Sequence, residues 1–247
     1  MRTIYLDGQY IKVSAQIIDA FAPGVFKAKG VFETMLGLDG VVSDVDLHIS
    51  RLRQGLKILS IKPPPIDRSI FRVLVSRNKL RSARVRLMVW KAGQEIHLMA
   101  AALPYKIPHK ESYRVCLIKT DRAANRRLAN VKSLDYEMFA GAYTKAQNKG
   151  FDEALLLNRR GFIFESSRAN IFWIKDKVLY TSPLSSGCLN GITRQQVIRQ
   201  AGHLGISVKE KNLTPDLLKA ADAAFLTNSL MGIKPIDIRS IGSLSID

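Results

Sequence analysis

Short apolar runs at close spacing dominate the second half of this 247-residue chain. Between positions 153 and 181 four of them follow one another, with the sequences EALLL, FIFE, NIFWI and KVLYT. Runs of this length that are separated by short polar turns predict β-strands joined by hairpins. Stretches with helical periodicity are interspersed without a strict strand–helix–strand rhythm. The sequence therefore predicts an α+β fold rather than a doubly wound parallel sheet.

The pattern of strands and helices divides the chain into two parts. The segment at 103–110, LPYKIPHK, carries two prolines and no clear period, so we place a domain linker there. A small N-terminal α/β domain is expected at 1–107, with a hairpin at 4–13, helices at 45–60 and 69–78, and strands at 85–90 and 95–101. A larger C-terminal domain is expected at 108–247, with a strand at 113–118, a helix at 134–150, the four strands above, and further elements at 194–204, 207–211, 214–221 and around 228.

A net charge of +17 is the most unusual bulk property of the chain. Basic residues concentrate at 68–86 and 122–127, where they form solvated faces or create a positive field that attracts anionic ligands. Nucleic-acid binding would also suit this charge. However, the sequence has no RNA-binding aromatic motif, zinc finger or helix-turn-helix pattern, so we expect no nucleic-acid partner.

Membrane and metal chemistry are not expected from this composition. The longest apolar runs fall well short of the roughly 18 residues that a membrane span needs, and the N-terminus resembles a strand rather than a signal peptide. The two cysteines, Cys116 and Cys188, lack metal-ligand spacing and sit in apolar sequence. Buried free thiols in a reducing cytoplasm are the expectation, with no metal site.

Lys132 is the first candidate for chemistry. Its surrounding sequence, LANVKSL, is much less charged than the chain average, which favours an amine that is partly removed from water. Such an amine can form a Schiff base with an aldehyde. Taken alone, a lysine between a strand and a helix is more often a surface residue. The motifs that follow it decide between the two interpretations.

Two further motifs follow Lys132 in sequence. Glu165 ends the apolar run GFIFE, where it is either an edge-strand charge or a carboxylate that holds the N–H of a pyridinium ring. The turn NGIT at 190–193 opens a predicted helix, and is either an ordinary helix start or a phosphate-binding one. An amine, a carboxylate and a phosphate seat together are the parts needed to hold a pyridine aldehyde with a phosphate tail.

The order of these motifs resembles that of the fold-type IV pyridoxal-phosphate enzymes. It consists of HxxRL at 48–52, Lys132, ExSxxN[IL]F at 165–172 and NGITR at 190–194. That class includes branched-chain and D-amino-acid aminotransferases and 4-amino-4-deoxychorismate lyase. The resemblance extends over nearly the whole chain, from GVFET at 30–34 to the last strands. It implies pyridoxal 5′-phosphate as cofactor and a larger domain with a barrel-like sheet.

The resemblance also implies roles for individual residues. Lys132 would be the Schiff-base lysine and proton shuttle, and Glu165 the partner of the pyridine nitrogen. Residues placed near the phosphate by the family pattern are Arg51, Ile192, Thr193 and Ser229, the last of them near either the phosphate or the substrate. Without this resemblance, the sequence would indicate only that Arg51 is an arginine on the surface of a helix.

The segment TNSLMG at 227–232 and Thr34 resemble the lyases of the class more than its aminotransferases. The expected activity is therefore conversion of 4-amino-4-deoxychorismate to 4-aminobenzoate and pyruvate, a reaction of folate biosynthesis, with Thr34 and Asn228 near a small anionic substrate. The alternative is a class-IV aminotransferase of the branched-chain or D-amino-acid type, which uses the same cofactor and lysine. The resemblance further implies a homodimer. One departure is AKG at 28–30, where the family usually has Gly-Asp-Gly.

Overall fold

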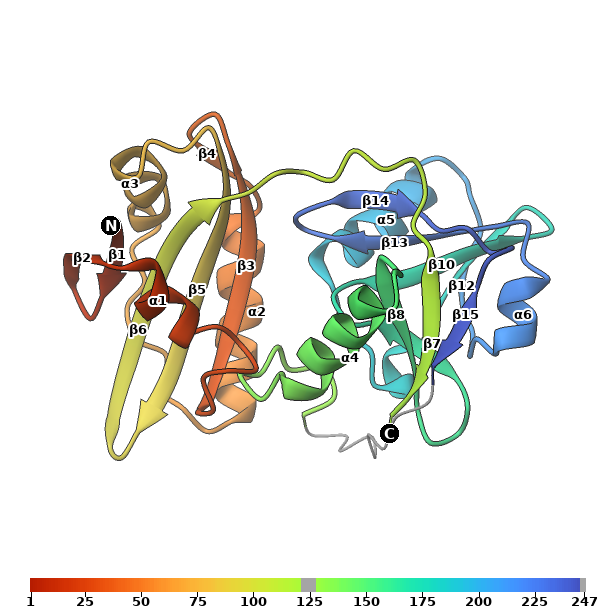
Figure 1. Cartoon of the computed structure of the whole chain (residues 1–247), viewed down its shortest axis with the longest axis horizontal. Coiled ribbons are helices and arrows are strands. Elements are labelled where there is room, and N and C mark those ends of the chain that lie inside the picture. Colours follow the sequence, from red (N-terminus) through yellow and green to blue (C-terminus); the bar gives the residue numbers. More distant parts are fainter. Residues whose placement is uncertain (121–127, 245–247) are drawn as a thin grey trace. The chain divides into compact units, whose positions relative to one another are not determined.

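The computed structural model describes residues 1–120 and 128–244, which form two compact units (Figure 1). The first unit comprises Met1–Ile107 with Val131–Glu137, and the second comprises Pro108–Asn130 with Met138–Asp247. Lys132 thus belongs to the first unit, whereas Glu165 and the 190–193 turn belong to the second. The predicted basic cluster at 122–127 lies outside the described residues.

The first unit is built on one antiparallel sheet with the strand order β2-β1-β6-β5-β3-β4. Its strands are β1 (Arg2–Leu6), β2 (Gln9–Val13), β3 (Lys29–Leu38), β4 (Val41–Val42), β5 (Ser82–Ala92) and β6 (Glu95–Pro104). Helices α2 (Val45–Ile58) and α3 (Ser69–Arg77) lie on one side of the sheet, and the short helix α1 (Ala15–Ala20) lies on the other (Figure 1).

Helix α2 follows directly from the apolar spacing of its sequence. Ile49, Leu52 and Leu56 recur at intervals of three and four residues, and all three are buried. The helix ends at Ile58 because Ser60 takes a positive φ of 56° and three prolines follow shortly after it. The helices expected at 45–60 and 69–78 are both confirmed, with ends that shift by one or two residues.

The second unit contains two mixed sheets. One has the order β12-β11-β10-β13-β14 and the other the order β15-β7-β8-β9. Their strands are β7 (Val115–Lys119), β8 (Glu153–Leu157), β9 (Ile163–Ser166), β10 (Asn170–Lys175), β11 (Val178–Thr181), β12 (Val208–Glu210), β13 (Ala223–Asn228), β14 (Gly232–Pro235) and β15 (Gly242–Leu244). Over the described residues both sheets are open, so the barrel-like sheet that was expected takes the form of two separate sheets.

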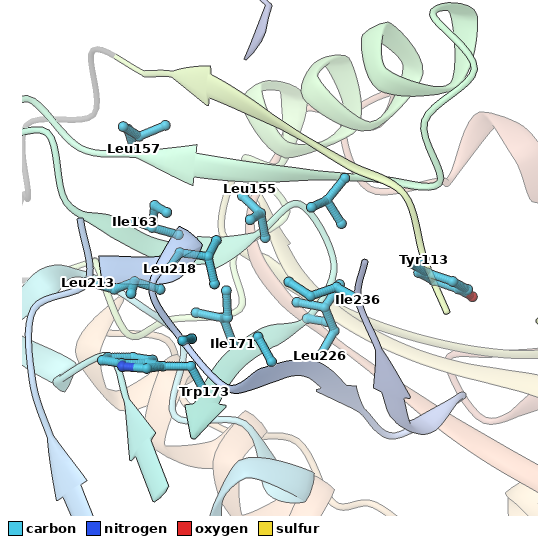
Figure 2. Close-up of a cluster of buried hydrophobic side chains, with 14 residues drawn as sticks. Tyr113, Leu155, Leu157, Ile163, Ile171, Trp173, Leu213, Leu218, Leu226 and Ile236 are labelled. Carbon is cyan, nitrogen blue, oxygen red and sulfur yellow. The ribbon is translucent and has the colours of Figure 1, made fainter. Parts of the chain in front are cut away.

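The helices of the second unit are α4 (Glu137–Asn148), α5 (Ile192–His203) and α6 (Pro215–Lys219), with a 3₁₀ turn at Leu184–Ser186. A core of buried side chains joins both sheets, with Leu155 from β8, Ile171 and Trp173 from β10 and Leu226 from β13 (Figure 2). Burying each such side chain stabilises a fold by about 1.5–3 kcal/mol. This core therefore fixes β8, β9 and β10 relative to one another.

Several elements differ from expectation. Helix α4 begins at Glu137 and not at 134, because the Leu134 N–H donates a 3.0 Å hydrogen bond to the Gly30 carbonyl and is thereby held at the edge of a sheet. Helix α1 and strand β15 were not predicted, since each is too short to show a period. Nowhere in residues 1–120 and 128–244 does a helix combine the length and the apolarity that crossing a membrane requires.

Candidate active site

The segment around Lys132 is hydrogen bonded to the start of strand β3. The Phe32 N–H donates to the Lys132 carbonyl over 2.9 Å, and Ser133 bridges to Val31 in antiparallel fashion. Gly30 leaves room both for this segment and for strand β5, since a Cβ atom there would lie 2.8 Å from the Leu134 Cδ1. A Cβ atom at that position would lie 2.4 Å from the Val89 carbonyl oxygen, so a larger residue would displace the neighbouring strand. The backbone of Lys132 is therefore fixed by the sheet itself.

Aromatic rings surround the Lys132 amine. Its Nζ lies 4.5 Å from the centroid of the Phe32 ring and 5.6 Å from that of Tyr136, and the two rings meet edge to face. Ring faces attract a cation. Lys132 is half-buried, so its surroundings are those of a sequestered amine and not of a solvated surface lysine.

The sheet face that carries Phe32 also carries polar groups. Thr34 lies two residues further along β3, on the same face, and pairs in register with Arg86 of β5. The Arg86 Nε is buried and has no hydrogen-bond partner in the part of the chain that the structure describes. Burial, with a smaller contribution from Arg84, lowers the pKa of Arg86 to about 10, so the guanidinium remains charged at neutral pH. Arg86 was not predicted as a site residue, although the arginines that alternate with apolar residues in RVRLMV are an available signal.

Arg51 is held by a buried carboxylate, Glu33. The Arg51 Nε and Nη2 donate to the two Glu33 oxygens over 2.7 and 2.6 Å, and the His48 Nδ1 lies 2.7 Å from Oε2. Burial alone would raise the pKa of Glu33, but the Arg51 charge, its hydrogen bonds and His48 outweigh this and hold the pKa at about 2. Arg51 is thus oriented by a fixed partner and is not a mobile surface side chain. Glu33 and His48 were not predicted as site residues, although both stand in the motifs that were used.

In the second unit, Glu165 and Asn170 bind the same residue, Leu189. A Glu165 oxygen accepts a hydrogen bond from the Leu189 N–H over 3.0 Å, and the Asn170 Nδ2 donates to the Leu189 carbonyl over 2.7 Å. Both side chains are nearly inaccessible to solvent. The structure thereby brings Glu165 together with the turn that precedes α5.

The turn itself presents a helix N-terminus. Gly191 is the N-cap of α5, Ile192 and Thr193 form its first turn, and no side chain of the described residues caps the helix. The first N–H groups of such a helix are unsatisfied and favour a bound anion. A Cβ at Gly191 would lie 2.1 Å from the Asn170 Oδ1, so the turn closes tightly onto β10.

Asn228 and Ser229 lie where β13 turns into β14. The Asn228 Oδ1 accepts hydrogen bonds from the N–H groups of Leu230 and Met231, and its Nδ2 donates to the Arg168 carbonyl. Asn228 therefore shapes this turn and ties it to the turn that follows β9. A contact of Asn228 or Thr34 with substrate, and of Ser229 with phosphate or substrate, stays a prediction.

Comparison with known proteins identifies the family. The family model described as amino-transferase class IV matches residues 30–238. The chain belongs to the class IV aminotransferase family. Members of this family use pyridoxal 5′-phosphate.

Some relatives of this class IV chain are named branched-chain aminotransferases, and others are named 4-amino-4-deoxychorismate lyases. A putative branched-chain-amino-acid aminotransferase of Methanocaldococcus jannaschii is 33% identical, covering 94% of this chain and 86% of that protein. The structure of a branched-chain aminotransferase from Thermoproteus uzoniensis, solved with norvaline, has a TM-score of 0.81 at 28% identity. The match covers 95% of this chain and 86% of that one. A structure from Legionella pneumophila named putative 4-amino-4-deoxychorismate lyase has a TM-score of 0.78 at 30% identity. The match covers 89% of this chain and 84% of that one.

The side chains of this class IV chain fit the family's cofactor. The uncapped N-terminus of α5, closed onto Asn170 at Gly191, is suited to a phosphate group, and Arg51 is a fixed cation with 13% of its side chain exposed. Glu165 is a buried carboxylate that can hold a protonated ring nitrogen. In contrast, no group of three or more potential metal ligands occurs within residues 1–120 and 128–244.

Proposed function

We propose that the protein is a lyase that converts 4-amino-4-deoxychorismate to 4-aminobenzoate and pyruvate. The observation that supports this most is the sheet face beside Lys132, which carries the Thr34 hydroxyl and the Arg86 guanidinium. A guanidinium whose buried Nε has no hydrogen-bond partner among the described residues suits an anionic substrate, and this substrate has two carboxylates. A branched apolar side chain would gain little from such a face.

Lys132 would bind the cofactor covalently, Arg51 and Thr193 would bind its phosphate, and Glu165 would keep its ring nitrogen protonated. When bound, pyridoxal phosphate supplies a conjugated ring that withdraws electrons from the carbon next to the substrate nitrogen.

The residues beside the substrate would then act in sequence. Once the substrate amine has taken its place on the cofactor, the Lys132 amine would remove the proton from the ring carbon that bears nitrogen, while Arg86 and Thr34 would orient the substrate. The bond between the neighbouring carbon and the enolpyruvyl oxygen breaks, with its electron pair leaving on oxygen. Protonation of the released enol gives pyruvate, and the ring that remains is aromatic, which makes the step favourable.

An aminotransferase is the second candidate, because relatives that carry that name match the chain over almost its full length. It would use Lys132 and Glu165 in the same way. In that case Arg86 would face the carboxylate of a dicarboxylic amino acid or keto acid.

Substrate assays separate the two candidates. The protein is incubated with 4-amino-4-deoxychorismate and, separately, with branched-chain amino acids and 2-oxoglutarate. We expect pyruvate to be released without exchange of amino groups, and amino exchange without pyruvate release would overturn the proposal. Lys132→Ala should abolish turnover together with the visible absorbance of bound cofactor, whereas Lys149→Ala, which alters an exposed lysine, should leave both intact.

The role of Arg86 has its own test. Arg86→Gln should lower kcat/KM for 4-amino-4-deoxychorismate by roughly 10- to 100-fold, the effect of losing one charged hydrogen bond. Arg81→Gln is the matched control, because Arg81 pairs with Asp39 on the exposed surface. Equal kcat/KM values in Arg86→Gln and Arg81→Gln would mean that Arg86 does not contact the substrate.

A further inference from the structure

We propose that Glu153 is a positioning residue for the cofactor-binding half of the second unit. Its carboxylate holds the turn between β9 and β10, and this turn sets the positions of Glu165 and Asn170. The inference rests on the family's cofactor and on the proposed role of Glu165. It does not depend on whether the enzyme is a lyase or an aminotransferase.

Glu153 is an unusual residue to find in a core. It is the first residue of β8 and is 1% exposed, and burial raises the pKa of its carboxyl group against the opposing effects of Arg168, Ser167 and the Ala154 N–H. A buried carboxylate is costly to a fold unless its oxygens are hydrogen bonded. Its partners therefore show what it stabilises.

Among the described residues, the side chains that donate to the Glu153 carboxylate both come from the turn between β9 and β10. The Ser167 hydroxyl donates to Oε1, which also accepts the Ala154 N–H, and the Arg168 Nε donates to Oε2 over 3.1 Å. The Ser167 N–H donates to the Ala154 carbonyl over 2.9 Å. One carboxylate thus fastens the turn to the start of β8.

Residues on both sides of this turn reach the candidate cofactor site. Glu165 precedes the turn and binds the Leu189 N–H, and Asn170 follows it and binds the Leu189 carbonyl. Asn170 also lies against Gly191, the N-cap of α5. A shift of the turn would therefore move the carboxylate for the ring nitrogen and the seat for the phosphate at the same time.

Arg168 extends the same network to two other elements. Its guanidinium lies 3.4 Å from the centroid of the Tyr143 ring in α4, and its carbonyl accepts from the Asn228 Nδ2. Because Glu153 pairs with Arg168, its charge stabilises the point at which α4, the β9–β10 turn and the β13–β14 turn meet. Loss of that charge should loosen the site without exposing the apolar core.

The test uses the whole protein and 4-deoxypyridoxine 5′-phosphate, a cofactor analogue that has no aldehyde and cannot bond to Lys132. Its dissociation constant therefore reports on non-covalent binding alone, whatever the outcome for catalysis. We expect Glu153→Gln to raise that constant by about tenfold, or 1.4 kcal/mol. Asp222→Asn, which breaks an exposed ion pair with Lys175 in the same unit, should leave it unchanged.

A second measurement separates positioning from general stability. The ring nitrogen of the bound analogue should lose its proton at lower pH in Glu153→Gln than in the parent protein, because Glu165 is displaced. A variant that melts at lower temperature but keeps the parent dissociation constant and ring titration would overturn the proposal.

Ser167→Ala provides a milder change if Glu153→Gln does not fold. It removes one donor to the carboxylate and should raise the dissociation constant about threefold, within the range of a single hydrogen bond. In the double variant with Glu153→Gln, Ser167→Ala should raise the dissociation constant by less than threefold, because both changes act on one contact. Unchanged binding in Ser167→Ala, or full additivity in the double variant, would contradict the proposal.

Discussion

At the scale of single residues, the buried pair of Glu33 and Arg51 is the feature with the clearest consequence. Glu33→Gln keeps the shape of the side chain but removes the charge that orients Arg51 and His48. We expect it to destabilise the protein by roughly 3 kcal/mol, since removing one member of a buried ion pair leaves the other uncompensated. It should also weaken cofactor binding through the loss of a fixed Arg51. Thermal unfolding and cofactor titration measure the two effects, and Asp7→Asn, at a partly exposed pair with His97, is the control.

The same carboxylate predicts a dependence of stability on pH. The pKa of Glu33 falls from 4.5 to about 2 on folding, so the folded state favours the ionised form. Its contribution is complete above about pH 4.5 and is lost as the pH falls through 2. Unfolding free energies measured between pH 5 and 2 should therefore fall less steeply in Glu33→Gln than in the parent protein. If the free energy of unfolding falls equally steeply with pH in both proteins, Glu33 is not the group that makes stability depend on pH.

At the scale of elements, the start of α5 depends on one glycine. Gly191→Ala would place a methyl group 2.1 Å from the Asn170 Oδ1 and push the 190–193 turn away from β10. We expect cofactor binding to weaken by about tenfold, corresponding to 1.4 kcal/mol. Gly202→Ala, in the same helix, meets nothing within 4 Å and should stabilise the protein by up to about 1 kcal/mol. Equal cofactor dissociation constants in the two variants would show that the turn does not bind the phosphate.

The elements of the fold were largely predictable because their signals are local. Strand β8 occupies the residues expected for it, and helices α2 and α3 follow their apolar spacing. The start of α4 was not predictable, because Leu134 is held by a hydrogen bond to Gly30 more than a hundred residues earlier. Glu153 was missed for the same reason. Its significance arises from its partners in the turn between β9 and β10, which a single sequence does not show.

At the scale of the whole molecule, the net charge of +17 should make capture of the proposed anionic substrate sensitive to salt. A positive field raises the encounter rate of an anionic substrate, and added salt screens it over a Debye length of about 10 Å at 0.1 M. Raising NaCl from about 0.02 to 0.3 M should therefore increase KM for the proposed substrate, 4-amino-4-deoxychorismate, several-fold while kcat changes little, because the proposed base Lys132 would act after the substrate is bound. Steady-state kinetics with potassium acetate and with NaCl distinguish general screening from competition by chloride. A KM that is unaffected by either salt would mean that the charge has no part in substrate binding.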